Sequence, residues 1–249
     1  MKEYHILNGD ALKEQFPDSL GTELIIAREC LVDGPVTDAS LAELFALRSK
    51  FISEEYGIGT KEDYIKSIRF EIEKIKAIDE YAAVNLWFED DLFCQVNFWF
   101  IASVLLDFGI KSKVYLVRPK VQNKYGFGGL AKEELIQRYQ ERIEIKNLEQ
   151  FANLWKFYCR GKLEEMLELA KRLSDKFPFV DMVVKAHIER GLHSEEGGRP
   201  TRVLRELIEK HGENNFAEVF KSFSESEHIY GFGDIQVKRI FDKIIKGAV

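Results

Sequence analysis

The sequence predicts an α/β fold, with a Rossmann-like, mainly parallel sheet, covering helices and an all-helical C-terminal domain. Short apolar runs alternate with longer segments of helical periodicity over the first half of the chain. After residue 129 we find no convincing strand, and the remaining segments have a helical pattern. Hydrophobic residues make up 45% of the 249 residues, which is enough for a buried core in one large or two modest domains.

Four short apolar runs, each followed by acidic residues, a turn or a proline, are predicted to be strands: residues 3–8, 23–28, 82–88 and 112–117. Between them the pattern predicts helices at residues 10–16, 40–55, 60–78 and 91–109. Thr60 and Asp63 have the spacing of a capping box at the start of the third of these helices. Strands alternating with helices in this way are typical of a mainly parallel sheet.

We predict a Rossmann-like domain over residues 1–145 and a helical domain over residues 146–249. The first helical segments after the sheet are predicted at 130–140, 147–160, 162–175 and 180–190. A polar, glycine-rich linker at 191–200 is followed by three short helices at 200–211, 214–224 and 234–246. The last part, residues 198–249, could form a helix-turn-helix or winged-helix-like unit, and the alternative is a solvated basic face balanced by acids.

Charge and composition restrict the partners. Residues 1–154 hold 19 Lys+Arg against 26 Asp+Glu, whereas residues 155–249 hold 17 against 16. Nucleic acid is therefore an unlikely partner for the N-terminal domain, and the question stays open for the C-terminal one. We expect no membrane span, because no apolar stretch is long enough. No signal peptide is visible and the three cysteines form no disulfide framework, so we expect a cytoplasmic protein.

Acidic residues directly follow three of the predicted strands. They are Asp10 in the stretch 8–10, Glu29 in the stretch 28–29 and all three residues at 89–91. The carboxyl ends of parallel strands meet at one edge of a sheet, and ligands of open α/β sheets bind at that edge. The sequence therefore predicts a small-molecule site there, for a nucleotide or another phosphorylated ligand.

Glu89 and Asp91 are the candidate catalytic residues, with Glu89 as the base. Crowded carboxylates raise each other's pKa, which suits acid–base chemistry. They could also hold a hard cation such as Mg²⁺. If the protein is an enzyme, carboxylate-driven hydrolysis or group transfer is the expected class. The alternative is a solvated acidic turn in which one carboxylate caps the following helix.

Five further residues are predicted to bind the ligand: Asn8, Gly9, Asp10, Glu29 and Gln95. A glycine allows close backbone approach, and N–H groups at a helix start attract anions. Gln95 interrupts an otherwise apolar helix one turn beyond Asp91, although a satisfied core amide explains it equally well. Asp10 could instead be a helix cap. The chain has neither GxGxxG nor GxxxxGK[ST], so a standard dinucleotide or P-loop site is not supported.

A ligand-sensing regulatory or interaction protein is the alternative function. In that interpretation the α/β part binds the ligand and the C-terminal helices contact DNA or a protein partner. Basic residues within 199–205 and 238–246 would supply the contact surface. The two hypotheses differ in a testable way, because the regulatory one needs these basic side chains to form an exposed stripe.

Several motifs resemble those of a bacterial family described as a domain of unknown function. Residues 5–10 match its H-I-x-N-G-D pattern, residues 87–95 its W-x-E-x-D-L-F-x-Q pattern and residues 28–35 its R-[ED]-x-L-x-[DE]-G-P pattern. The resemblance continues in the second region, at Trp155, residues 198–201 and residues 233–234. It covers nearly the whole chain and implies no particular activity. One departure is Cys94, where members of that family often have aspartate.

Overall fold

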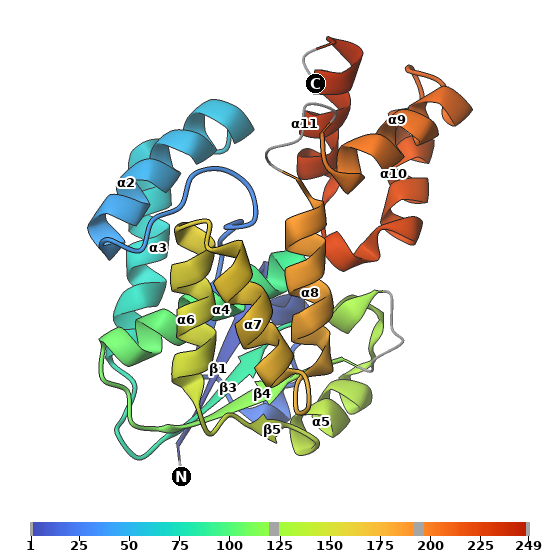
Figure 1. Ribbon diagram of the computed structural model, residues 1–249. Coiled ribbons are helices and arrows are strands. Elements are labelled where there is room, and N and C mark those ends of the chain that lie inside the picture. The colour runs from blue at the N-terminus through green and yellow to red at the C-terminus, as the bar shows by residue number, and fades with distance from the viewer. Residues whose placement is uncertain (1, 120–124, 192–196, 248–249) are drawn as a thin grey trace. The chain divides into compact units, whose positions relative to one another are not determined.

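A computed structural model describes residues 2–119, 125–191 and 197–247 of the chain (Figure 1). It contains a five-stranded, mostly parallel sheet with many helices, which confirms the predicted fold class. Part of the predicted linker at 191–200 lies outside the described residues.

The sheet has the strand order β2-β1-β3-β4-β5, which is the flavodoxin-like order of doubly wound folds. The first four strands are parallel, and β5 runs antiparallel to β4. Their bounds are Glu3–Asn8 for β1, Leu24–Ala27 for β2, Ala83–Trp87 for β3, Lys113–Val117 for β4 and Ile143–Glu144 for β5. The expectation that no strand follows residue 129 is therefore wrong. A two-residue strand is too short to show a period in the sequence.

All four helices predicted for the first half are present. They are α1 (Asp10–Gln15), α2 (Leu41–Phe51, continued by a π-helical turn to Tyr56), α3 (Lys61–Lys76) and α4 (Leu92–Asp107). After β4 come the 3₁₀ turn η3 (Gly126–Gly129), α5 (Lys132–Gln140) and α6 (Leu148–Cys159). The capping box of Thr60 and Asp63 forms as the sequence predicts.

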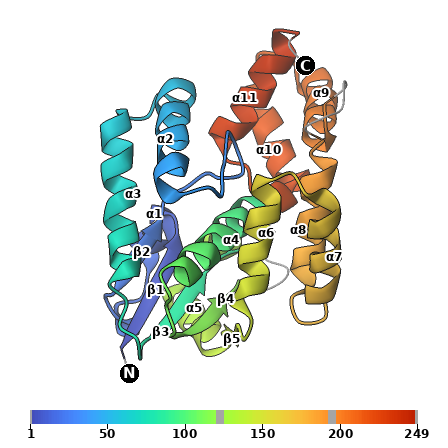
Figure 2. The ribbon, with the colours of Figure 1, turned by 60° about the vertical axis from the view of Figure 1, so that its left-hand side comes forward.

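Both faces of the sheet are buried. Leu7, Trp87 and Val117 are matched across neighbouring strands and pack with residues of α1, η3 and α5. Alternate strand residues, such as Ile6 and Leu86, point to the opposite face and are fully buried. Figures 1 and 2 show α4 on that face, with α6 beside it. The nearly uniform apolarity of α4 fits this position, because a helix buried on all sides needs no polar face.

The β2 edge of the sheet is covered by side chains of α3. The Ile26 backbone N–H donates to a carboxylate oxygen of Glu71 (3.0 Å), and the Lys74 ammonium donates to the Leu24 carbonyl (3.3 Å). Glu71 is itself buried and also accepts from Arg28 (2.7 Å), and these partners lower its pKa against the effect of burial. The contacts satisfy backbone groups that an edge strand otherwise leaves open to another chain.

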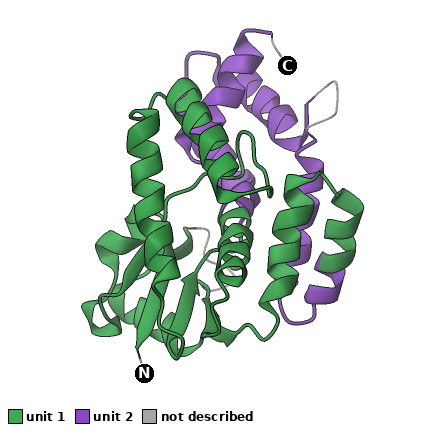
Figure 3. Ribbon diagram, turned by 90° about the vertical axis from the view of Figure 1, so that its left-hand side faces the viewer, with its two compact units in different colours: residues 1–90, 94–169 green, residues 91–93, 170–249 purple. Residues whose placement is uncertain are grey.

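The chain divides into two compact units (Figure 3). The first contains residues 1–90 and 94–169, and the second contains residues 91–93 and 170–249. The division therefore falls later than residue 145, where the sequence placed the end of the first domain. The reason is aromatic packing of α6 on α4 within the first unit. The ring centroids of Phe98 and Phe151 are 4.7 Å apart, and those of Phe100 and Trp155 are 5.2 Å apart.

The second unit is helical. It contains the end of α7 (Leu163–Leu173), then α8 (Pro178–Glu189), α9 (Arg199–His211), α10 (Phe216–Ser226), the 3₁₀ turn η4 (His228–Tyr230) and α11 (Asp234–Ile245). The last three helices pack on one another through a small core that includes Leu204, Phe223 and Val237.

Two basic residues of the predicted contact surface are ion-paired. Arg199 binds Glu189 (2.8 Å) and Glu227 (2.9 Å), and Lys238 binds Asp242. A nucleic acid would have to compete with these carboxylates, so the helix-turn-helix hypothesis gains no support from Arg199 or Lys238. Within the part of the chain that the structure describes, no helix combines the length and apolarity that crossing a bilayer requires.

Candidate functional site

The strand order places a topological switch point between β1 and β3. From β1 the chain moves outward to β2, and it then crosses back to β3 and continues to β4 on the other side. In folds of this type ligands bind at the carboxyl ends of the strands at such a point. Here those ends are Asn8 on β1 and residues 87–89 at the end of β3.

A chain of side-chain amides crosses the switch point. The buried Asn97 of α4 donates to the Asn8 side-chain oxygen (2.9 Å) and to the Glu29 backbone carbonyl (2.6 Å), and it accepts from the Leu31 N–H (3.3 Å). Asn8 in turn donates its amide N–H to the Cys94 sulfur (2.9 Å). Because Asn97 donates to the oxygen of Asn8, the Asn8 amide can only present its nitrogen to Cys94. The network therefore fixes the Asn8 amide N–H as a hydrogen-bond donor to the Cys94 sulfur.

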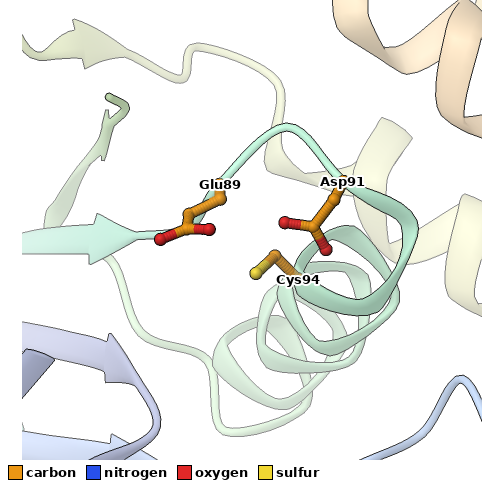
Figure 4. Close-up of side chains that lie close together, drawn as sticks. All are labelled: Glu89, Asp91 and Cys94. Atoms are coloured by element: carbon orange, nitrogen blue, oxygen red, sulfur yellow. The ribbon is translucent and has the colours of Figure 1, made fainter. Parts of the chain in front are cut away.

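Glu89, Asp91 and Cys94 gather at the turn between β3 and α4 (Figure 4). One sulfur and one oxygen from each carboxylate all lie within 4.8 Å of one another. In Figure 4 the Cys94 sulfur points into the space between the two carboxylates. Cys94 is buried and the two acids are partly buried. The three residues belong to one six-residue stretch, so the turn itself brings them together. The structure thus groups the two predicted catalytic carboxylates and adds a thiol.

The Glu89 carboxylate is held by the loop after β4. It accepts the Phe127 backbone N–H (2.7 Å). A Cβ at Gly126 would lie 2.0 Å from the same carboxylate, and Gly126 has φ of +57°, so only glycine fits there without strain. The sequence left open whether residues 125–129 close over a ligand or merely cross between domains. The contact shows that this loop orients Glu89.

Gly126→Ala is expected to destabilise the first unit by about 1–3 kcal/mol, because it combines a strained positive φ with a clash on Glu89. Gly128→Ala in the same turn is the matched control. A Cβ there meets nothing within 4 Å, and φ is not positive, so a change below about 0.5 kcal/mol is expected. Urea unfolding of both variants measures the difference. Equal midpoints would show that the Glu89 contact does not constrain the loop.

A second glycine is fitted to Asp91. Within the second unit, a Cβ at Gly231 would lie 2.0 Å from an Asp91 carboxylate oxygen, and φ is +62°. The sequence around the two glycines is the same, because residues 125–128 and 230–233 both read Tyr-Gly-Phe-Gly. This repeat is the signal in the sequence that could have linked both loops to the carboxylates after β3.

Gln95 follows Cys94 in the sequence and has a buried side-chain oxygen that accepts no hydrogen bond from the described residues. Its side chain is fully buried, and its amide nitrogen donates to the Glu89 backbone carbonyl (2.7 Å). Its side-chain oxygen has no hydrogen-bond partner among the described residues. A buried amide oxygen left without a donor costs about 1–3 kcal/mol, so this oxygen is an open acceptor beside the turn.

The carboxyl ends of the parallel strands, with the residues that directly follow them, form the rim of the sheet. Asp10 and Gly9 lie on this rim, at the start of α1. Arg28 donates to both Asp10 carboxylate oxygens (2.7 and 2.9 Å), and these bonds lower the pKa of Asp10. Gly9 adopts φ of +88°, and no atom lies within 4 Å of where its Cβ would be. The structure therefore gives Asp10 an ion-pair partner rather than a place beside Glu89. The N-cap residue of α1 is Gly9, so Asp10 is the first residue of the helix and not its cap.

Glu29 is buried below the rim with its own partners. Its carboxylate pairs with Arg48, accepts from the Tyr64 hydroxyl and accepts from the Cys30 N–H. Burial raises the pKa of Glu29, whereas Arg48 and Tyr64 oppose that shift. Its contribution to the switch point is the backbone carbonyl bound by Asn97. The side chain holds residues 29–33 in place and lies outside the group at Glu89.

The third acid after β3 also has a partner. Arg118, directly after β4, donates to both oxygens of Asp90, with one bond of 2.6 Å. This pair ties the carboxyl ends of β3 and β4 together. Of the three acids at 89–91, Asp90 therefore performs a structural task, while Glu89 and Asp91 turn toward Cys94.

A narrow cavity lies beside the amide network, between β2, α3 and α4. It is mostly apolar, and its polar rim includes Arg28, Glu71 and Asn97. Its enclosed part holds about one water molecule, so a nucleotide does not fit into it.

Comparison with protein-family models, with curated proteins and with solved structures finds no match to this chain.

Proposed function

We propose that this protein binds a small phosphorylated ligand, of the nucleotide or sugar-phosphate class, at the carboxyl ends of β1 and β3. Asn8, Glu89, Asp91 and Gln95 are the polar anchors of the site. The observation that carries the proposal is the polar network at the switch point. It interrupts α4, which is otherwise apolar, at the end of the helix that faces the strand ends.

The chemistry of the rim also suggests how such a ligand is held. Two carboxylates repel a phosphate, so the ligand would bind together with a divalent cation. The Phe127 N–H orients the Glu89 carboxylate at the edge of the group. Hydrolysis or group transfer is the reaction class that these carboxylates support.

A thermal-shift panel tests the proposal. The probes are ATP, ADP, AMP, glucose 6-phosphate and inorganic phosphate, each with Mg²⁺, with Zn²⁺ and with a chelator. A probe at one hundred times its Kd should add about 2.7 kcal/mol to the free energy of unfolding, and therefore raise the Tm by several degrees. Phosphate release from each probe that binds measures turnover.

Two isosteric variants test whether ligand binding depends on Glu89 specifically or on any acid near the strand ends. Glu89→Gln should abolish the Tm shift, because it removes a charge of the group while keeping an acceptor for Phe127. Asp10→Asn is the matched control, since Asp10 is an acid of the same rim bound by Arg28, and it should keep the shift. If no probe shifts the Tm under any condition, the phosphorylated-ligand proposal is wrong.

A further inference from the structure

We infer that Glu89, Asp91 and Cys94 form a Zn²⁺ site with an open fourth position. This inference concerns the site of the proposed function and deepens it by naming the cation. The geometry is the first argument. Ligand atoms around tetrahedral zinc lie roughly 3.3–3.8 Å apart, as follows from metal–ligand distances of about 2.0–2.3 Å. The three donor atoms here already lie within 4.8 Å of one another, so small side-chain rotations bring them to that spacing.

The unpartnered oxygen of Gln95 is an independent sign of something bound at the turn. The amide nitrogen of this side chain is 2.7 Å from the Glu89 carbonyl, so the side-chain oxygen lies within about 5 Å of that carbonyl. It is buried and lacks a donor among the described residues. A polar group of something bound at the turn would supply that donor.

The surroundings of Cys94 fit a metal-bound thiolate. Asn8 donates an N–H to its sulfur, and Asn97 prevents the Asn8 amide from turning round. Donors of this kind orient a metal ligand and stabilise its charged form. With a thiolate at Cys94 the three residues carry three negative charges, of which a divalent cation offsets two.

The donor set selects the metal. Mg²⁺ and Ca²⁺ take oxygen ligands, so a thiolate in the group argues against both. Zn²⁺ binds cysteine sulfur and carboxylate oxygen together, and three protein ligands with one open position are the pattern of zinc sites that act on a bound molecule. The open position is where a phosphate oxygen of the ligand would bind.

The test uses the full-length, reduced protein after removal of metals with a chelator. Zn²⁺ is titrated against a chromophoric competitor, and Co²⁺ serves as a spectroscopic probe. We expect one Zn²⁺ per chain, together with a thiolate-to-cobalt charge-transfer band in the near ultraviolet. Cys94→Ser should remove the band and weaken Zn²⁺ binding by more than about 100-fold, since loss of an outer-shell partner alone costs 10–100-fold.

The two other cysteines provide matched controls. Cys30→Ser and Cys159→Ser should keep both the band and the affinity, because neither residue belongs to the group of donors at the turn. Glu89→Gln should weaken Zn²⁺ binding and leave the cobalt–thiolate band detectable at higher Co²⁺. If Zn²⁺ does not bind at about equimolar concentration, or if Cys94→Ser binds it as wild type does, the inference is wrong.

This experiment contains no phosphorylated probe, so its outcome is separate from that of the thermal-shift panel. Zn²⁺ binding with an unresponsive panel would leave the metal site standing and reject the ligand class. A probe that shifts the Tm in Mg²⁺ or in chelator, without any Zn²⁺ binding, would reject the metal site and keep the ligand class.

Discussion

Replacing Arg48 with methionine should lower the free energy of unfolding of the first unit by about 3–5 kcal/mol, the usual cost of leaving a buried charge without its partner. The Arg48 side chain is fully buried. It donates to the backbone carbonyls of Cys30 (2.9 Å) and Asp33, and it pairs with Glu29 at 3.4 Å. Methionine fills a similar volume, but it leaves the buried Glu29 carboxylate without its cation and removes the donors that the two carbonyls accept from Arg48.

Chemical unfolding of three variants checks this expectation. Arg160→Met is the control, because Arg160 pairs with Asp38 at 2.7 Å while more than half exposed, and such pairs contribute about 0–1 kcal/mol. The double variant Arg48→Met with Glu29→Gln should lose less than the sum of its two single variants, because each single change leaves a charge unpaired. A loss below about 1 kcal/mol for Arg48→Met would show that residues 29–33 are held by other contacts.

Acidification from pH 7 to pH 5 should destabilise the second unit by about 2 kcal/mol through one histidine. His187 on α8 is buried, and burial together with the charge of Arg190 lowers its pKa to about 3. In the unfolded chain the same ring has a pKa near 6.5. Between these two values the unfolded state binds the extra proton, so stability falls as the pH drops below about 6.5 and the full loss is reached near pH 3.

The change is measured as urea midpoints between pH 7 and pH 5 for wild type and His187→Leu, which stays neutral throughout. The variant should lose most of the pH dependence in this range. Burial also lowers the pKa of His5 in the first unit, so His5 adds a loss of stability on acidification in both wild type and His187→Leu. The effect of His187 is therefore the difference between the pH dependence of wild type and that of the variant. His228→Leu, which changes an exposed histidine of the second unit, should behave as wild type. Parallel curves for wild type and His187→Leu would exclude His187 as the cause.

The fold class followed from local patterns in the sequence. Apolar runs such as residues 3–8 and 82–88 indicate strands wherever they occur, and Thr60 with Asp63 marks a helix start through contacts three residues apart. These signals depend on neighbours along the chain, so they survive without knowledge of the tertiary structure. The strand β5 was missed because its pairing with β4 is non-local and only two residues long.

The partners of the rim acids could not be predicted in the same way. The sequence identified Asp10, Glu29 and residues 89–91 as acids that follow strands. It could not say that Arg28 would bind Asp10, that Arg48 would bind Glu29 or that Arg118 would bind Asp90. The partners in these pairs are 18, 19 and 28 positions apart in the sequence. Each pair therefore depends on how the strands and helices pack.

The sequence by itself therefore determined the α/β class, the strand positions and the edge of the sheet at which acids collect, because periodicity and turn chemistry are local properties. Only the tertiary structure decided which of those acids pair with arginines and which side chains hold Cys94. Packing of α4 on the sheet brings Cys94 to Asn8 and sets Gln95 against the Glu89 carbonyl. The same packing pairs Asp10, Glu29 and Asp90 with arginines. The physical reason is that the partners of ion pairs and buried amides are far apart in the sequence and become neighbours only when the chain folds.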